Sequence, residues 1–128
     1  MKLLHVALVR SSEAASDRFF QGLLDLEKRR TKTASAELCA GLFGIAEEHR
    51  MVDYGNEHLL FEVFLSTRQD LAAPHIGHVC LEVEDLGGLL SRCAAFGVEV
   101  RQVARGDGSA VTFLADGDGN LFEIKQRA

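Results

Sequence analysis

Hydrophobic and polar residues alternate along residues 76–83, which predicts a half-buried strand. His78, Cys80 and Glu82 fall on one face of that strand. Asp85 then stands where a helix N-cap belongs, and apolar residues spaced three and four apart predict a helix over 86–96. Gly97 follows as its C-terminal cap. The same alternation predicts three strands after this helix, at 98–103, 110–115 and 121–126.

The first half of the chain carries a similar pattern. A strand is predicted over 3–9, with His5, Ala7 and Val9 on one face. A helix over 13–24 follows, and Asp25 takes the turn after it because Asp tolerates left-handed backbone angles. Helical spacing also predicts a short helix within the strand region, over 34–45. The remaining strands are predicted at 26–32, 47–53 and 58–65.

Two short sequence motifs occur once in each half of the chain. His5-Val6-Ala7-Leu8 matches His78-Val79-Cys80-Leu81, and Leu60-Phe61-Glu62-Val63 matches Leu121-Phe122-Glu123-Ile124. The order strand, helix and three strands is therefore stated twice, which predicts an α+β fold of two repeated βαβββ modules. We expect one domain over 1–128, with module one at 1–66, a polar link at 67–74 that ends at Pro74, and module two at 75–128.

The repeated polar residues are the best candidates for chemistry. Two imidazoles and two carboxylates, from His5, Glu62, His78 and Glu123, suit one divalent ion such as Zn, Ni, Co, Fe or Mn. A single strand histidine is more often structural than a ligand. Glu62 is different, because a carboxylate within an apolar strand must be neutralised, paired or bound to metal.

Three other histidines are set aside. His75 precedes its strand and breaks the match with His5, while His49 and His58 are predicted to face solvent. The cysteines Cys39, Cys80 and Cys93 fall on apolar positions, where a buried thiol behaves as a small hydrophobe. They are odd in number and form no CxxC pair, which favours a reducing cytoplasm.

Composition narrows the function further. A chain of 128 residues, 47% hydrophobic, fits one soluble domain with a core of its own. The net charge of −5 argues against nucleic acid and anionic membrane as partners. The N-terminal apolar run is interrupted by His5 and lacks a small-residue cleavage site, so no signal peptide is predicted. No apolar stretch approaches the length of a membrane span.

The motifs resemble the vicinal oxygen chelate superfamily, which includes glyoxalases, bleomycin resistance proteins and extradiol dioxygenases. The resemblance is clearest at 77–86, at 96–100 and at 118–124. It implies a single glyoxalase-like domain in which paired βαβββ modules form a cupped mixed sheet around the metal. It places His5, Glu62, His78 and Glu123 on the four usual ligand positions, closest to the glyoxalase I set. Glutathione-using members carry Arg and Asn where this chain has Val9 and Ser66, which argues against glutathione.

The resemblance implies a metal-dependent lyase or isomerase that acts on a small substrate with adjacent oxygens through an enediolate. Glu123 and Glu62 are the expected proton-transfer groups, and family likeness favours Glu123 as the base. Two alternatives stay open, a non-catalytic protein that sequesters a small molecule and a ring-cleaving dioxygenase. A homodimer is expected for two reasons. Natural proteins usually cover the open edges of their sheets, and the resemblance implies a dimer, because family members of this length form dimers.

Overall fold

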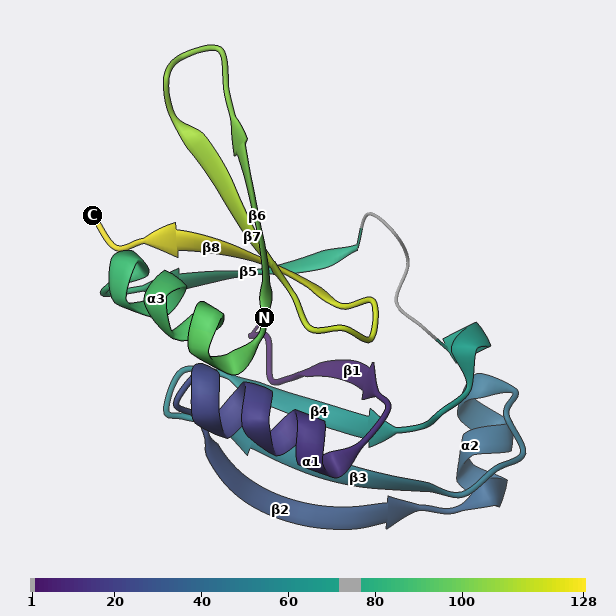
Figure 1. Cartoon of the computed structure of the whole chain (residues 1–128). Helices are drawn as coiled ribbons and strands as arrows, with labels where there is room; N and C mark the ends of the chain where they lie inside the picture. The colour runs from purple at the N-terminus through teal and green to yellow at the C-terminus, as the bar shows by residue number, and fades with distance from the viewer. Residues whose placement is uncertain (1, 72–76) are drawn as a thin grey trace. The chain divides into compact units, whose positions relative to one another are not determined.

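Each half of the chain folds into a four-stranded mixed sheet with a helix packed on one face (Figure 1). The computed structural model describes residues 2–71 and 77–128, which form two compact units, 1–71 and 72–128. In each unit the first strand pairs in parallel with the last, and the other pairings are antiparallel.

The first unit has the strand order β1-β4-β3-β2. Its elements are β1 (Val6–Arg10), α1 (Glu13–Ser16), the π-helical turn η1 (Asp17–Leu23), β2 (Glu27–Ala34), α2 (Ala36–Phe43), β3 (His49–Gly55), β4 (Leu60–Leu65) and the 3-10 turn η2 (Gln69–Leu71). The helix expected at 34–45 is therefore present as α2, which Ser35 caps by accepting a hydrogen bond from the Leu38 N–H.

The second unit has the matching order β5-β8-β7-β6. Its elements are β5 (His78–Val83), α3 (Leu86–Phe96), β6 (Glu99–Ala104), β7 (Ala110–Ala115) and β8 (Leu121–Gln126). Helix α3 has the predicted bounds: the Asp85 side chain accepts a hydrogen bond from the Gly88 N–H, and Gly97 ends the helix with φ +66°.

The predicted helix over 13–24 is only partly α-helical. After α1 the chain widens into π geometry, so the Leu24 N–H donates to the Phe19 carbonyl five residues earlier. Phe19, Phe20 and Leu23 are all buried by this turn. The Phe20 ring stacks on Tyr54 at 4.9 Å between centroids, which fixes the helical segment to the sheet. The following turn is at Asp25, with φ +56°, as predicted.

A bulge in β2 decides which way its basic side chains point. Lys28 is aligned with Tyr54 on β3, but Arg30 is aligned with Asp53, so one extra residue lies between the two pairings. Lys28 consequently reaches the helix face, where its ammonium lies 3.0 Å from Asp17. Arg30 and Lys32 lie on the opposite face of the sheet, which also carries Asp53 and Glu62.

The α+β class and the repeated modules are confirmed by these two sheets. The organisation as one domain stays a prediction, as do the module boundaries. Part of the expected link, with Pro74 and His75, lies outside the described residues. Among the residues that are described, no helix has both the length and the apolar character to cross a membrane.

Candidate metal site

The first histidine–glutamate pair lies on the parallel β1–β4 ladder, on the face of the sheet opposite the helical segment of α1 and η1. Ala7 is aligned with Glu62 in this ladder, and His5 precedes Ala7 by two residues. The strand predicted over 3–9 is observed as Val6–Arg10, so His5 stands just before β1 and not within it. Its Nε2 atom lies 2.7 Å from Oε2 of Glu62. The parallel pairing thus brings together two residues that are far apart in sequence.

The second pair repeats this register in the other unit. Cys80 on β5 is aligned with Glu123 on β8, and His78 precedes Cys80 by two residues. Nε2 of His78 lies 3.5 Å from Oε2 of Glu123. Each unit therefore presents one imidazole nitrogen diagonally across a parallel ladder from one carboxylate.

The carboxylates are the more enclosed members of both pairs. The Glu62 and Glu123 side chains are 12% and 16% exposed, whereas those of His5 and His78 are 48% and 35% exposed. A carboxylate removed from water to this extent requires a positive partner or several hydrogen-bond donors. The open imidazoles leave an approach to each carboxylate from solvent.

In the first unit, further charges surround Glu62. Lys32 on β2 places its ammonium 2.8 Å from Oε1 of Glu62 and 3.9 Å from Oδ2 of Asp53. Asp53 is aligned with Glu62 across β3 and β4, and its Oδ2 also accepts from Arg30 at 3.3 Å. The other oxygen, Oδ1, is buried and has no hydrogen-bond partner among the described residues. Oδ1 of Asp53 therefore leaves part of the negative charge of these two neighbouring carboxylates without a hydrogen-bond donor.

The second unit has an apolar wall where the first has these charges. Phe113 is aligned with Glu123, as Asp53 is with Glu62, and its ring packs edge-on against His78 at 5.0 Å between centroids. Among the described residues, the ammonium nearest Glu123 is that of Lys125, 3.7 Å from its Oε1. The Glu123 carboxylate is consequently less tightly paired than that of Glu62.

Cys80 is a correction to the expected burial of all three cysteines. Its side chain is exposed, while Cys39 and Cys93 are buried as predicted. Partial desolvation raises the pKa of the Cys80 thiol, and the charge of Glu123 raises this pKa further. Cys80 therefore stands beside Glu123 as a neutral thiol.

The donor set fits a divalent ion in its chemistry. Imidazole nitrogen and carboxylate oxygen are ligands shared by Zn, Ni, Co, Fe and Mn sites. Within the described parts of the chain, no group of three or more His, Cys, Asp or Glu side chains is arranged to hold a metal. Each unit supplies two donors, and the joint use of all four at one ion stays a prediction.

Sequence reasoning missed several residues of this region. Lys32 and Asp53 lie beside Glu62, and the β2 bulge that places Lys32 there carries no clear signal in the sequence. The prediction for His49 was wrong: it is 6% exposed, because α2 and the segment that follows it cover the end of β3. His58 is exposed as predicted, although it lies in the turn before β4.

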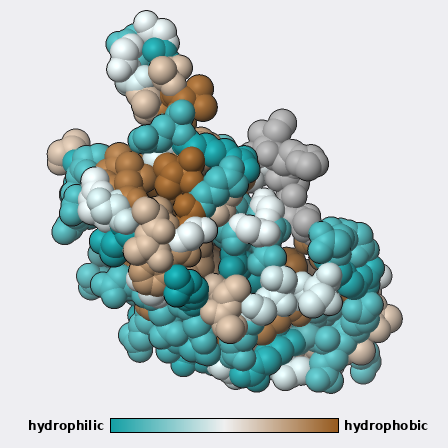
Figure 2. Space-filling view, viewed as in Figure 1, coloured by the Kyte–Doolittle hydropathy of each residue, from teal (hydrophilic) through white to brown (hydrophobic). Residues whose placement is uncertain are grey.

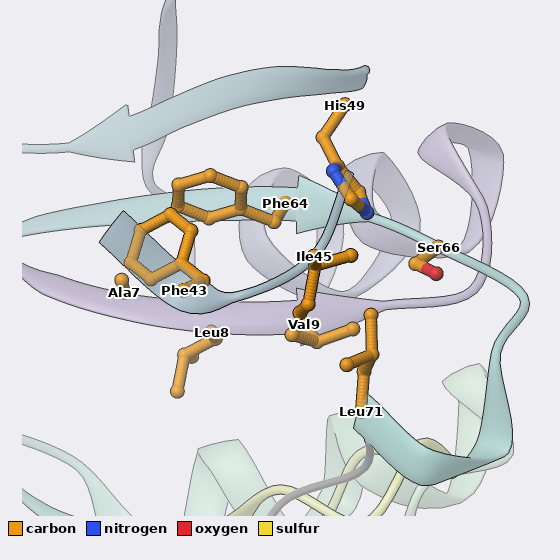
Figure 3. Close-up of a pocket in the computed structure, with 9 residues that line it drawn as sticks. All are labelled: Ala7, Leu8, Val9, Phe43, Ile45, His49, Phe64, Ser66 and Leu71. Atoms are coloured by element: carbon orange, nitrogen blue, oxygen red, sulfur yellow. The ribbon is translucent and has the colours of Figure 1, made fainter. Parts of the chain in front are cut away.

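A pocket adjoins the first pair within the same unit. It encloses about 220 Å³ and is lined by Ala7, Leu8, Val9, Phe43, Ile45, His49, Phe64, Ser66 and Leu71 (Figure 3). Phe64 lies two residues beyond Glu62 on the same face of β4, and Ala7 is aligned with Glu62. Two residues of the pocket lining, Ala7 and Phe64, are therefore direct neighbours of Glu62 on this face of the sheet.

The chain matches the sequence profile of the family described as Glyoxalase/Bleomycin resistance protein/Dioxygenase superfamily, over residues 2–124. No curated protein matches it.

Solved structures share its fold at low identity. The glyoxalase family protein from Enterococcus faecalis is 20% identical, with a TM-score of 0.70 over 96% of this chain and 95% of that one. The fosfomycin resistance protein FosX from Listeria monocytogenes is 17% identical, with a TM-score of 0.75 over 99% and 94%. An E126Q variant of that FosX, 15% identical with a TM-score of 0.73 over 99% and 93%, was solved with Mn(II) and 1S,2S-dihydroxypropylphosphonic acid.

Proposed function

Because the chain belongs to the Glyoxalase/Bleomycin resistance protein/Dioxygenase superfamily, we propose that it is a metal-dependent lyase or isomerase that acts on a small substrate with adjacent oxygens. The resemblance predicted from the motifs is thereby confirmed at the level of the family. The observation that carries the proposal is the repeated register, in which Ala7 and Cys80 align with Glu62 and Glu123 and a histidine stands two residues earlier.

The proposed metal ligands are His5, Glu62, His78 and Glu123. A bound divalent ion would act as a Lewis acid that polarises the adjacent oxygens of the substrate. Each histidine must present an unprotonated Nε2 to the ion, and each carboxylate must give up part of its present contact with that nitrogen. In the first unit Lys32 keeps Oε1 of Glu62 neutralised and ordered.

Glu123 is the better candidate for the base. A carboxylate that accepts a proton from carbon needs an oxygen that is not already held by strong donors. Glu62 has Lys32 at 2.8 Å and His5 at 2.7 Å, while Nε2 of His78 and the ammonium of Lys125 lie 3.5 Å and 3.7 Å from Glu123. The apolar ring of Phe113 beside His78 also keeps water from one side of this pair. Both features favour proton transfer at Glu123.

The substrate class follows from the donor arrangement and from a relative. The FosX variant solved with Mn(II) contains a compound with two neighbouring hydroxyl groups. Hydroxy-ketones and 2-oxo acid derivatives offer this chain an equivalent pair of oxygens. The half-buried ammonium of Lys32 and the exposed guanidinium of Arg30 provide positive charge for an acidic substituent on such a substrate.

The test is exchange of a carbon-bound proton in deuterated water. Metal-loaded wild-type protein should exchange the proton next to the carbonyl of hydroxy-ketones such as dihydroxyacetone, followed by proton NMR. Glu123→Gln should lose roughly 10²–10⁴-fold in rate, because an amide has no usable basicity. Glu82→Gln is the matched control, since Glu82 lies on β5 and pairs with Arg127 at 3.0 Å on the surface. Equal exchange rates in Glu123→Gln and wild type would remove Glu123 as the base.

The sequestering alternative is favoured by the largely apolar pocket beside the first pair, which needs no metal to hold a small molecule. It predicts stoichiometric capture of a small molecule without any proton exchange or bond rearrangement. A ring-cleaving dioxygenase would instead consume O₂ with a catechol, which an oxygen electrode measures. Elemental analysis of the purified protein distinguishes the two metal-dependent enzyme functions from metal-free binding of a small molecule.

We further propose that the protein works as a homodimer in the cytoplasm. The edge strands are β1 and β2 in the first sheet and β5 and β6 in the second, and each has a neighbouring strand on only one side within its own sheet. Three free cysteines suit a compartment that keeps thiols reduced. The hairpin of β6 and β7 extends from its own sheet, and Figure 2 shows apolar side chains among its surface atoms. Val103 on this hairpin is 65% exposed, as expected for a surface that a partner covers.

A further inference from the structure

The pocket of the first unit contains a buried histidine that no part of the proposed metal chemistry uses. His49, at the start of β3, is 6% exposed. Figure 3 shows its ring directed into the pocket between Phe64 and Ser66, with Ile45, Val9 and Leu71 across the space. Apart from His49 and Ser66, the lining side chains are apolar.

The hydrogen bond at Nδ1 determines what the other ring nitrogen can do. Nδ1 lies 2.9 Å from the carbonyl oxygen of Glu47, which can only accept, so Nδ1 carries the proton and donates. Cys39 stands 3.5 Å from the same nitrogen. In the neutral ring Nε2 is then a bare acceptor. Within residues 2–71 and 77–128, Nε2 has no hydrogen-bond partner.

We propose that this pocket binds a monocyclic aromatic group that carries a hydroxyl, and that the hydroxyl donates to Nε2 of His49. A dry cavity of about 150 Å³ is large enough for benzene. The 220 Å³ here therefore accommodates one substituted ring, in contact with Phe64 and Phe43. A purely apolar guest would displace water from Nε2 of His49 and leave this acceptor without a donor, which costs binding energy.

The position of the pocket gives the site a role. Ala7 and Phe64 line it and also flank Glu62 on the same face of the sheet. A ring held there has its free end beside the His5–Glu62 pair. The inference that this ring is the specificity group of the substrate rests on the proposed function. The binding of the ring itself does not, because it needs neither metal nor Glu123.

The experiment uses metal-free full-length protein and three probes: p-cresol, phenol and toluene. Calorimetry should show one p-cresol or phenol bound per chain. Toluene should bind about 2–12-fold more weakly than p-cresol, the equivalent of one net hydrogen bond. His49→Phe keeps a ring in place but removes the acceptor, so it should abolish the preference for p-cresol over toluene.

A blocking variant keeps the test independent of any effect of His49 on folding. Ala7 is exposed, so Ala7→Phe can be accommodated while its ring covers the pocket. This variant should weaken p-cresol binding at least tenfold. Ala110→Phe, the same change at an exposed strand alanine of the second unit, should leave binding unchanged. Long-range proton–nitrogen NMR should also show His49 with its proton on Nδ1, and p-cresol should shift the Nε2 resonance.

Three results would overturn the proposal. They are absence of p-cresol binding at millimolar concentration, equal binding of p-cresol and toluene to wild type, and unchanged p-cresol binding in Ala7→Phe. Failure of the metal chemistry would leave all these measurements as expected, since they are made without metal. Failure of the pocket would likewise leave metal content and proton exchange intact.

Discussion

Replacing His5, His78 or both with alanine tests whether the two histidine–glutamate pairs hold one ion together or one ion each. The pairs have the same register but belong to different units. If all four side chains share one ion, wild-type protein binds one divalent ion per chain, and either replacement weakens that same ion. If the pairs act separately, wild type binds two ions weakly, and each replacement removes one without changing the other.

The size of the effect follows from the ligand count and the present contacts. A structural zinc site with four ligands is worth about 10–16 kcal/mol, so one ligand contributes about 2.5–4 kcal/mol if the total is shared equally. Metal binding must first break the contact between His5 and Glu62, which costs about 1 kcal/mol of the binding free energy. The two atoms are 2.7 Å apart, but water weakens their interaction because the His5 side chain is 48% exposed. Each alanine variant should therefore lose about 1.5–3 kcal/mol, or about 10–150-fold in affinity.

The assay is competition with a chromophoric chelator, using Zn²⁺ and Co²⁺ on freshly stripped protein. His58→Ala is the matched control, because the His58 side chain is 75% exposed and its Nε2 lies 3.3 Å from Oε1 of Glu57, which belongs to neither pair. The shared-site reasoning is refuted if wild type takes up two ions per chain and His5→Ala retains one at unchanged affinity. It is equally refuted if His5→Ala and His58→Ala bind metal alike.

The remaining predictions concern stability and assembly. Tyr54→Phe should lower the free energy of unfolding by about 1.5–3 kcal/mol in urea titrations, because the fully buried hydroxyl donates to Asp17 at 2.7 Å; a loss under about 0.5 kcal/mol would contradict this. Arg50, and then Lys28, lower the pKa of Glu13 in the folded state, so this stabilisation is present above the unfolded pKa of 4.5 and is lost as pH falls through the lower folded pKa. The stability gap between wild type and Glu13→Gln should accordingly narrow as the pH falls below 4.5, and a constant gap would be inconsistent with it. Light scattering should give a dimer mass at micromolar concentration, and a monomer mass with full activity would exclude the proposed assembly.

Local signals in the sequence were sufficient for much of the fold. Helix α3 could be placed to the residue, because Asp85 and Gly97 satisfy its end groups with short-range bonds of their own. Alternation placed β7 and β8 equally well. The repeated sequence motifs around His5, Glu62, His78 and Glu123 also predicted both histidine–glutamate pairs. A duplicated module repeats its strand pairings together with its residues.

What the sequence left open depended on contacts between distant residues. The bulge between Lys28 and Arg30 reverses the face of every later residue in β2, and it is set by pairing with β3. Only this reversal brings Lys32 to Glu62. His49 has the pattern of a surface residue, and its burial comes from α2 and the segment after it. Local hydrogen bonds are encoded within a few residues, but the face a side chain occupies and the neighbours it meets are decided when strands pair and helices cover them.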